Sequence, residues 1–287
     1  LSLALAAIML IGMMVVSASA VSYNDLTDKD QIVNKDAVSM LVSLGIIEGK
    51  PDGSYAPTEN VDRAQMAKML SVIMNKGVDN SALYQSVNSG LTDITSHWAK
   101  GHINYCYTTG IIAGRGNGTF DPSATVTALE AAKMLLVAVG YDPKIEGFEG
   151  ADWAINVSVR ADEQGIFEGF TKDLSAPLNR DDAALLIYNA LDVEMIQSYT
   201  TNNYPIAYSD HRTILADKYG VIKVQGVVVA NEWASLASDD GDAALKEGKT
   251  TIYNGEGIFS TTGNTTVSKE DASLKTQTFN VSTPVDM

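Results

Sequence analysis

The sequence predicts an α+β protein that is mainly α-helical over residues 22–195 and carries a small β-rich module over residues 196–287. Three observations indicate this class. A glycine–isoleucine motif recurs three times, each copy is followed by a helix with one apolar face, and β-branched residues become frequent after Met195. We therefore interpret the helical part as repeated units that share a core, because one short unit cannot bury its apolar face alone.

The first twenty residues differ from the rest of the chain. Residues 3–16 are almost purely apolar, and Ala18-Ser19-Ala20 follows them. This order is typical of a secretory signal peptide with cleavage before Val21. We predict that residues 1–20 are such a peptide, with its own beginning missing, and that no membrane segment remains after cleavage. An uncleaved membrane anchor is the alternative.

A Gly-Ile-(Ile/Phe)-x-Gly motif marks the repeat. In each copy a proline lies twelve residues after the first glycine, as Pro57, Pro122 and Pro177. A helical pattern precedes each motif, and we expect the glycines to end those helices, because positive φ angles cost glycine little. The motif glycines, to which we assign a structural role, are Gly45, Gly49, Gly110, Gly114, Gly165 and Gly169.

A second helix is predicted after each proline. Residues 62–65 and 127–130 have the capping-box pattern, in which two side chains satisfy N–H groups at a helix start, and residues 179–182 have a weaker version. Apolar residues then recur with i, i+3, i+4, i+7 spacing, which places them on one helix face. These residues are Met66, Met69, Leu70 and Ile73, then Ala131, Met134, Leu135 and Ala138, then Ala183, Leu186, Ile187 and Ala190.

The order of these motifs resembles the S-layer homology (SLH) domain: a Trp-Ala helix, Gly-Ile-x-x-Gly, Asp-Gly-x-Phe-x-Pro, and a Thr-Arg-Ala-Glu helix start. The match is best over residues 93–135. It defines three predicted SLH repeats, named here segment 1 (22–77), segment 2 (90–142) and segment 3 (146–195). The resemblance implies that the three segments form a pseudo-threefold bundle, with grooves between neighbouring segments.

The resemblance also implies a function. SLH proteins are secreted and attach non-covalently to secondary cell-wall polysaccharide, which often carries pyruvyl ketals. A ketal carboxylate suits arginine, whose planar fork can donate two parallel hydrogen bonds. We therefore expect a cell-wall or S-layer protein of the cell surface, with self-association in a surface layer as a further expectation. No catalytic residue, cofactor or metal is predicted.

Position within the family motif nominates the glycan-binding residues. Arg63 and Arg180 occupy the arginine position of Thr-Arg-Ala-Glu, whereas segment 2 has Ala128 there. Two grooves at most are therefore expected to be competent. The alternative for both arginines is a solvated position at a helix start.

Two aspartates and two tryptophans complete the predicted site. Asp25 and Asp93 occupy an early aspartate position, where segment 3 has Phe148. Their alternative role is to cap a helix or stabilise a turn. Trp98 and Trp153 are predicted either to contact the sugar or to pack between neighbouring segments.

Composition and motifs exclude several other functions. The net charge of −15 disfavours nucleic-acid binding, because like charges repel. The three histidines lack metal-ligand spacing. The sequence also contains no Gly-x-Ser-x-Gly nucleophile motif of hydrolases, no P-loop and no dinucleotide-binding motif. Two alternatives to simple anchoring stay open. One is a cell-surface hydrolase whose catalytic domain lies in or beyond the C-terminal region, and the other is a self-assembling S-layer protein.

The C-terminal module is predicted from three β-type patterns. Residues 221–229 are rich in valine and isoleucine, residues 251–259 indicate a hairpin around Asn254-Gly255, and residues 276–281 indicate another strand. We expect this module to be truncated at Met287, and it resembles no family that we recognise.

Overall fold

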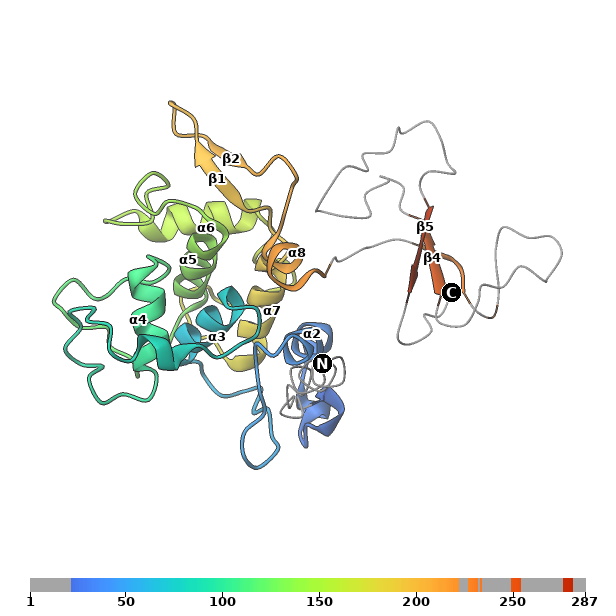
Figure 1. The fold of residues 1–287 in the computed structure, drawn as a ribbon, viewed down its shortest axis with the longest axis horizontal. Helices are drawn as coiled ribbons and strands as arrows, with labels where there is room; N and C mark the ends of the chain where they lie inside the picture. Colours follow the sequence, from blue (N-terminus) through green and yellow to red (C-terminus); the bar gives the residue numbers. More distant parts are fainter. Residues whose placement is uncertain (1–21, 222–226, 232, 234–248, 254–275, 281–287) are drawn as a thin grey trace, which may run out of the picture. The chain divides into compact units, whose positions relative to one another are not determined.

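A computed structural model describes the chain over residues 22–221, 227–231, 233, 249–253 and 276–280 (Figure 1). The predicted signal peptide, residues 1–20, and the predicted Asn254-Gly255 turn lie outside these ranges. Helices dominate, and two small antiparallel sheets accompany them, which confirms the α+β class. Within the described ranges, no helix has the length and apolar character needed to cross a bilayer.

Contacts divide the chain into two compact units. Unit 1 comprises residues 1–131 and 169–188, and unit 2 comprises residues 132–168 and 189–287. The helices of unit 1 are α2 (Lys35–Ser43), α3 (Arg63–Met74), α4 (Lys100–Thr108), the start of α5 (Ala128–Val139) and most of α7 (Arg180–Ala190), with 3-10 helices at Tyr23–Asp25, Lys29–Gln31 and Ser81–Tyr84.

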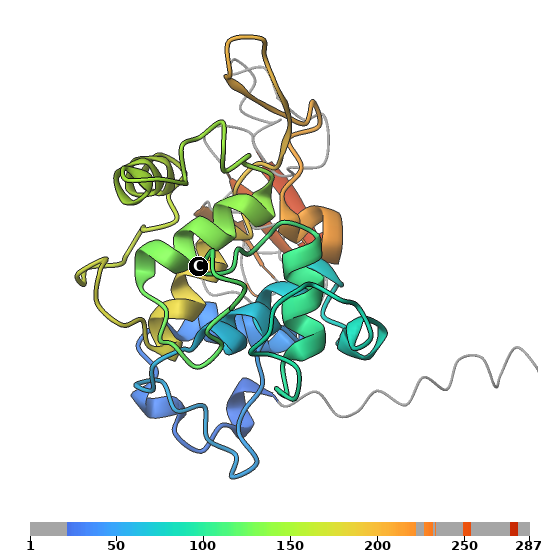
Figure 2. The same cartoon turned by 90° about the vertical axis from the view of Figure 1, so that its left-hand side faces the viewer.

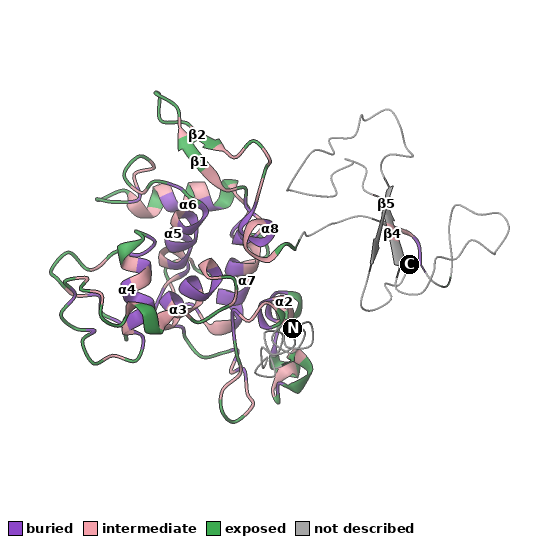
Figure 3. Ribbon diagram, in the orientation of Figure 1, coloured by how far each residue is buried: buried purple, intermediate pink, exposed green. Residues whose placement is uncertain are grey.

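The predicted caps begin α3, α5 and α7. Asp62 accepts a hydrogen bond from the backbone of Gln65 at 2.7 Å, and the Gln65 side chain accepts one from the Asp62 N–H at 3.0 Å. Thr127 and Glu130 make the same reciprocal pair. Asn179 caps α7 from one side only. Behind these caps the apolar stripes are buried, except at Met69, which is half-exposed (Figure 3).

Three backbone hydrogen bonds join the starts of these helices in a closed ring. Val61 donates to the Leu178 carbonyl at 2.8 Å, Leu178 donates to Val126 at 2.8 Å, and Val126 donates to Val61 at 2.9 Å. All three residues are buried. Val61, Val126 and Leu178 lie two positions before α3, α5 and α7, respectively. The ring therefore joins the same position of the repeat in all three segments.

The loop before α7 differs from its counterparts in length. The carbonyls of Pro57, Pro122 and Leu174 each accept a hydrogen bond from the second residue of α7, α3 and α5, at 3.1, 3.0 and 3.1 Å. Leu174, rather than Pro177, therefore takes the position of the other prolines. Treating Pro177 as the equivalent of Pro57 and Pro122 was therefore wrong by three residues. With Leu174 as their equivalent, Arg180 takes the same position in segment 3 as Arg63 in segment 1.

α4 lies against α3 and against the 3-10 helix at Ser81–Tyr84 (Figure 2). Ala99, Ile103 and Cys106 are fully buried, as their helical spacing predicts. The Cys106 thiol donates to the Ala67 carbonyl of α3 at 3.4 Å, and burial raises its pKa. Cys106 is thus a packing residue.

Unit 2 contains the remaining elements. They are α6 (Trp153–Glu163), β1 (Ile196–Tyr199), β2 (Pro205–Ala207), α8 (Ile214–Tyr219), β3 (Val227–Ala230), β4 (Lys249–Tyr253) and β5 (Thr276–Asn280). The β1–β2 hairpin is tied to residues 142–146, because the Tyr199 hydroxyl accepts from the Asp142 N–H and donates to Glu146. Arg160 of α6 bonds the same Glu146 carboxylate.

The C-terminal strands form an antiparallel sheet in the order β3-β4-β5. The strand predicted at 276–281 is confirmed by β5, and β3 covers the end of the strand predicted at 221–229, of which residues 222–226 lie outside the described ranges. Of the predicted hairpin at 251–259, residues 251–253 belong to β4, and residues 254–259 lie outside the described ranges.

Candidate ligand-binding cavity

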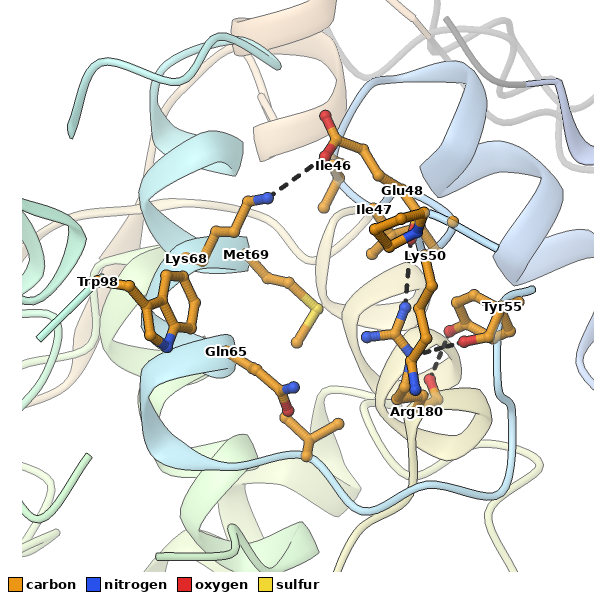
Figure 4. A pocket seen from close by; sticks show the side chains of 13 residues that line it. Ile46, Ile47, Glu48, Lys50, Tyr55, Gln65, Lys68, Met69, Trp98 and Arg180 are labelled. Atoms are coloured by element: carbon orange, nitrogen blue, oxygen red, sulfur yellow. Dashed lines mark hydrogen bonds and ion pairs between the residues drawn. The ribbon is translucent and has the colours of Figure 1, made fainter. Parts of the chain in front are cut away.

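A cavity of about 260 Å³ opens on unit 1 between the loop after α2 and the exposed side of α3 (Figure 4). Apolar side chains form part of its wall, and cationic side chains lie around them. The lining residues are Ile46, Ile47, Glu48, Gly49, Lys50, Pro51, Tyr55, Val61, Gln65, Lys68, Met69, Trp98 and Arg180.

Arg180 is the best-anchored cation of this cavity. Its Nε donates to the Tyr55 carbonyl at 2.7 Å, and one terminal nitrogen donates to the Glu48 carbonyl at 3.2 Å. The guanidinium carbon lies 4.8 Å from the Tyr55 ring centre. Of the five guanidinium N–H groups, only these two have an acceptor among the described residues. The fork is therefore fixed in place and still presents donors to a ligand.

The rest of the lining combines charge with apolar surface. Trp98 is 56% exposed and stands across the cavity from Arg180 (Figure 4). Lys68 pairs with the Glu48 carboxylate at 3.3 Å, and Lys50 pairs with Glu59. A guanidinium fork opposite an exposed indole suits a ligand that has an anionic group and an apolar face.

Arg63 makes the same contacts as Arg180 but is enclosed. Its Nε donates to the Phe120 carbonyl at 2.9 Å, a terminal nitrogen donates to the Ala113 carbonyl at 2.8 Å, and the guanidinium lies 4.3 Å from the Phe120 ring centre. Only 4% of the residue is exposed. Burial, and then the nearby charge of Arg115, lower the Arg63 pKa to about 10, so the side chain stays cationic at neutral pH. The alternative of a solvated position is wrong for Arg63.

The early aspartates hold the loops. Asp93 accepts hydrogen bonds from the N–H groups of residues 120–121 at 2.9 and 2.7 Å. Although partial burial opposes the shift, these donors keep the Asp93 pKa below its usual value. In segment 1 the same two bonds, to residues 55–56, come from Asp28. Pairing Asp25 with Asp93 was therefore wrong by three residues. Asp25 is exposed and completes a capping box at the first 3-10 helix.

The two tryptophans have different surroundings. Trp98 stands on the rim of the cavity, which residues of segments 1 and 3 also line, and its side chain is largely exposed. Trp153 begins α6 in unit 2, is half-buried, and has the Lys133 ammonium 5.6 Å from its ring centre. It is not among the residues that line the cavity.

The motif glycines are explained by backbone geometry. Gly45, Gly110 and Gly165 end their helices with φ angles of 70°, 80° and 69°, and Gly169 also has positive φ. Gly49 and Gly114 are required for close packing instead. A Cβ atom on Gly114, for example, would lie 2.8 Å from the Thr119 carbonyl oxygen. Among the described residues, no cluster of three or more histidine, cysteine or carboxylate side chains could hold a metal ion.

Comparison with known proteins agrees with this description. The model of the S-layer homology domain matches residues 22–67 and 90–132. A cell surface protein of Thermoanaerobacter kivui is 28% identical over 253 residues, which are 86% of this chain and 30% of that protein. An S-layer protein of Bacillus licheniformis is 33% identical over 113 residues, which are 39% of this chain and 12% of that protein.

Some relatives have enzymatic names. Exoglucanase XynX of Acetivibrio thermocellus is 27% identical over 188 residues, which are 60% of this chain and 16% of that enzyme. The chain thus spans less than a third of the length of these relatives. Residues 22–67 and 90–132 match the S-layer homology domain, and this match together with the surface-protein relatives supports a secreted location at the cell wall or cell surface.

Proposed function

We propose that this chain anchors an exported protein to the cell wall by binding the acidic sugars of secondary cell-wall polysaccharide in the Arg180 cavity. The observation that carries the proposal is the fixed guanidinium of Arg180, which keeps unused donors facing a cavity opposite an exposed indole. A pyruvyl ketal would offer its carboxylate to the fork, and the sugar ring would lie against Trp98.

The charge distribution supports an anionic ligand. The chain carries a net charge of −15, and a negatively charged polymer would be repelled by most of its surface. At the cavity, however, Arg180, Lys50 and Lys68 gather around one opening. Binding would therefore be local, and it would weaken as salt screens these charges.

We further propose that segments 1, 2 and 3 are three SLH repeats around a pseudo-threefold axis. The ring of hydrogen bonds among Val61, Val126 and Leu178 supports this arrangement, because each residue donates once and accepts once. The equivalent contacts of Arg63 and Arg180 also support it. Segment 2 has Ala128 at the arginine position and would lack this contact.

The chain itself is proposed to be non-catalytic, and Arg180, Trp98 and Lys68 are its ligand-binding residues. Asp93 and Asp28 act as loop supports in this proposal, and Arg63 as a buried structural cation. The exoglucanase relative favours one second candidate, a surface hydrolase that uses these segments as its anchor. Self-association in a surface layer is compatible with either.

A sedimentation assay with sacculi of Thermoanaerobacter kivui tests the proposal. The full chain should bind native sacculi and lose binding after the wall polysaccharide is chemically removed. Arg180→Ala should weaken binding about tenfold to a hundredfold, the size expected for lost hydrogen bonds to a charged group. Arg212→Ala is the matched control, because it removes one arginine that does not line the cavity.

Two results would contradict the proposal. Binding that survives on bare peptidoglycan would exclude the polysaccharide as the ligand. Equal binding by Arg180→Ala and Arg212→Ala would exclude the cavity as the site.

A further inference from the structure

Glu48 contributes to the cavity in two separate ways. Its backbone carbonyl accepts a hydrogen bond from Arg180 at 3.2 Å, and its carboxylate pairs with the Lys68 ammonium at 3.3 Å (Figure 4). The Glu48 side chain is 67% exposed and that of Lys68 is 36% exposed. In the free protein, therefore, the Glu48 carboxylate is already paired with Lys68, one of the cations of the candidate site.

The backbone contact does not need the carboxylate. At the same motif position segment 2 has Ala113, whose carbonyl accepts from Arg63 at 2.8 Å. An alanine thus supports the arginine as well as a glutamate does. The Glu48 carboxylate must be explained by another effect, and among the described residues it pairs with Lys68 of the cavity lining.

We infer that Glu48 is an internal competitor for the ligand and that Glu48 and Lys68 together determine how strongly the cavity selects acidic sugars. In the free protein the Glu48 carboxylate neutralises Lys68. An incoming carboxylate bonds Arg180 and exchanges with Glu48 at Lys68. A neutral ligand leaves the Glu48–Lys68 pair intact. This inference rests on the proposed function of the cavity.

The exchange predicts opposite effects for the two partners. Glu48→Gln keeps the size of the side chain and the carbonyl, and it should tighten binding of an acidic ligand about twofold to fivefold, the range for an exposed ion pair. Lys68→Met should weaken binding by a similar factor. In the Lys68→Met background, the gain from Glu48→Gln should largely disappear, because no cation is left to be released.

The probe is a hexopyranoside with a 4,6-linked pyruvyl ketal, and its neutral control is the methyl ester of the same compound. Affinity for the full chain is measured by calorimetry. Glu168→Gln is the matched variant, because it removes the same charge from the same motif position of segment 3. We expect Glu48→Gln to tighten binding of the acid alone, and Glu168→Gln to change neither affinity. Circular dichroism checks that each variant is folded.

The outcomes separate this inference from the proposed function. If Arg180→Ala weakens acid binding but Glu48→Gln and Lys68→Met do not alter it, Glu48 is not a competitor for the ligand. The cavity would still be the binding site in that case. If Glu48→Gln tightens acid and ester equally, the effect is not charge exchange. If neither the native chain nor Glu48→Gln binds the acid, both proposals fail for pyruvylated sugars.

Discussion

Arg63 and Arg180 show how one residue type can serve two purposes in equivalent positions. Each guanidinium donates to two carbonyls and lies on an aromatic ring. Arg63 is almost completely enclosed, whereas Arg180 faces a cavity. The first is therefore expected to contribute to stability and the second to binding.

Replacing Arg63 by alanine should destabilise the protein. The Phe120 and Ala113 carbonyls would lose a charged donor in a buried place, and a cavity would remain, so we expect a loss of about 2–4 kcal/mol in the free energy of unfolding. Urea denaturation measures it. Arg180→Ala is the comparison, with an expected loss of less than about 1.5 kcal/mol. Equal losses would contradict the structural role of Arg63.

His102 is a buried titratable group between α3 and α4. The Ser71 hydroxyl donates to the Lys68 carbonyl, so its oxygen can accept from His102 Nδ1 at 2.6 Å. The other ring nitrogen, Nε2, lies 3.6 Å from the Asp79 carboxylate. Burial lowers the His102 pKa, Asp79 opposes this shift, and Lys68 adds to it.

The lowered pKa of His102 makes stability depend on pH. The unfolded chain binds a proton at a higher pH than the folded chain, so stability should fall as the pH drops below about 6.5 towards the folded pKa. Urea denaturation between pH 8 and pH 5 would follow this loss. His102→Gln should flatten that part of the curve, while His97→Gln should keep it. An unchanged slope in His102→Gln would show that another group is responsible.

At the scale of elements, the segment before α4 is held by one glycine and one asparagine. The Asn104 side chain donates to the carbonyls of Tyr84 and Val87, both at 2.9 Å. Gly101 lies so close that an added Cβ would stand 2.1 Å from the Ser81 carbonyl oxygen. This contact explains why the second residue of α4 is a glycine despite the low helix propensity of glycine.

Gly101→Ala should release residues 81–87 from α4. Because the contact is with backbone, the segment cannot yield by rotating a side chain, and it must move away. Limited chymotrypsin digestion should then cleave after Tyr84 faster than in the native chain. Gly110→Ala strains the end of α4 through its positive φ of 80°, but its added Cβ meets nothing within 4 Å, so it should accelerate that cleavage less than Gly101→Ala does. Equal rates in both variants would refute the proposed contact.

At the scale of the whole molecule, the ring of Val61, Val126 and Leu178 joins residues that are far apart in the chain. No single segment can form it. Opening one of these hydrogen bonds requires the starts of two helices to separate. Each of those two helix starts is also hydrogen-bonded to the start of the third helix, so the three are expected to open together.

Native-state hydrogen exchange should therefore report one shared opening. The amides of Val61, Val126 and Leu178 are expected to exchange with the same free energy, close to that of global unfolding of unit 1. The exposed turn around Gly90 should exchange much faster and serves as the internal reference. A Leu178 amide that opens well before the other two would show that the ring is not cooperative.

Most local structure could be predicted from the residues. Capping pairs, apolar stripes and helix-ending glycines depend on neighbours within a few positions, and α3, α5 and α7 begin where those patterns indicate. Asp28 was also within reach, because it stands 27 residues before Tyr55, as Asp93 does before Phe120. The lining residues Glu48, Lys50 and Lys68 had no such pattern.

The α+β class, the repeating helical pattern and the resemblance to the SLH domain could be predicted from the residues alone, since these depend on short-range spacing. Which arginine is enclosed and which faces a cavity follows from the folded chain. Those properties depend on contacts across 57 positions for Arg63 and 125 positions for Arg180. Loop length, burial and neighbouring side chains set the surroundings of each guanidinium, and none of these can be inferred from the residue type alone.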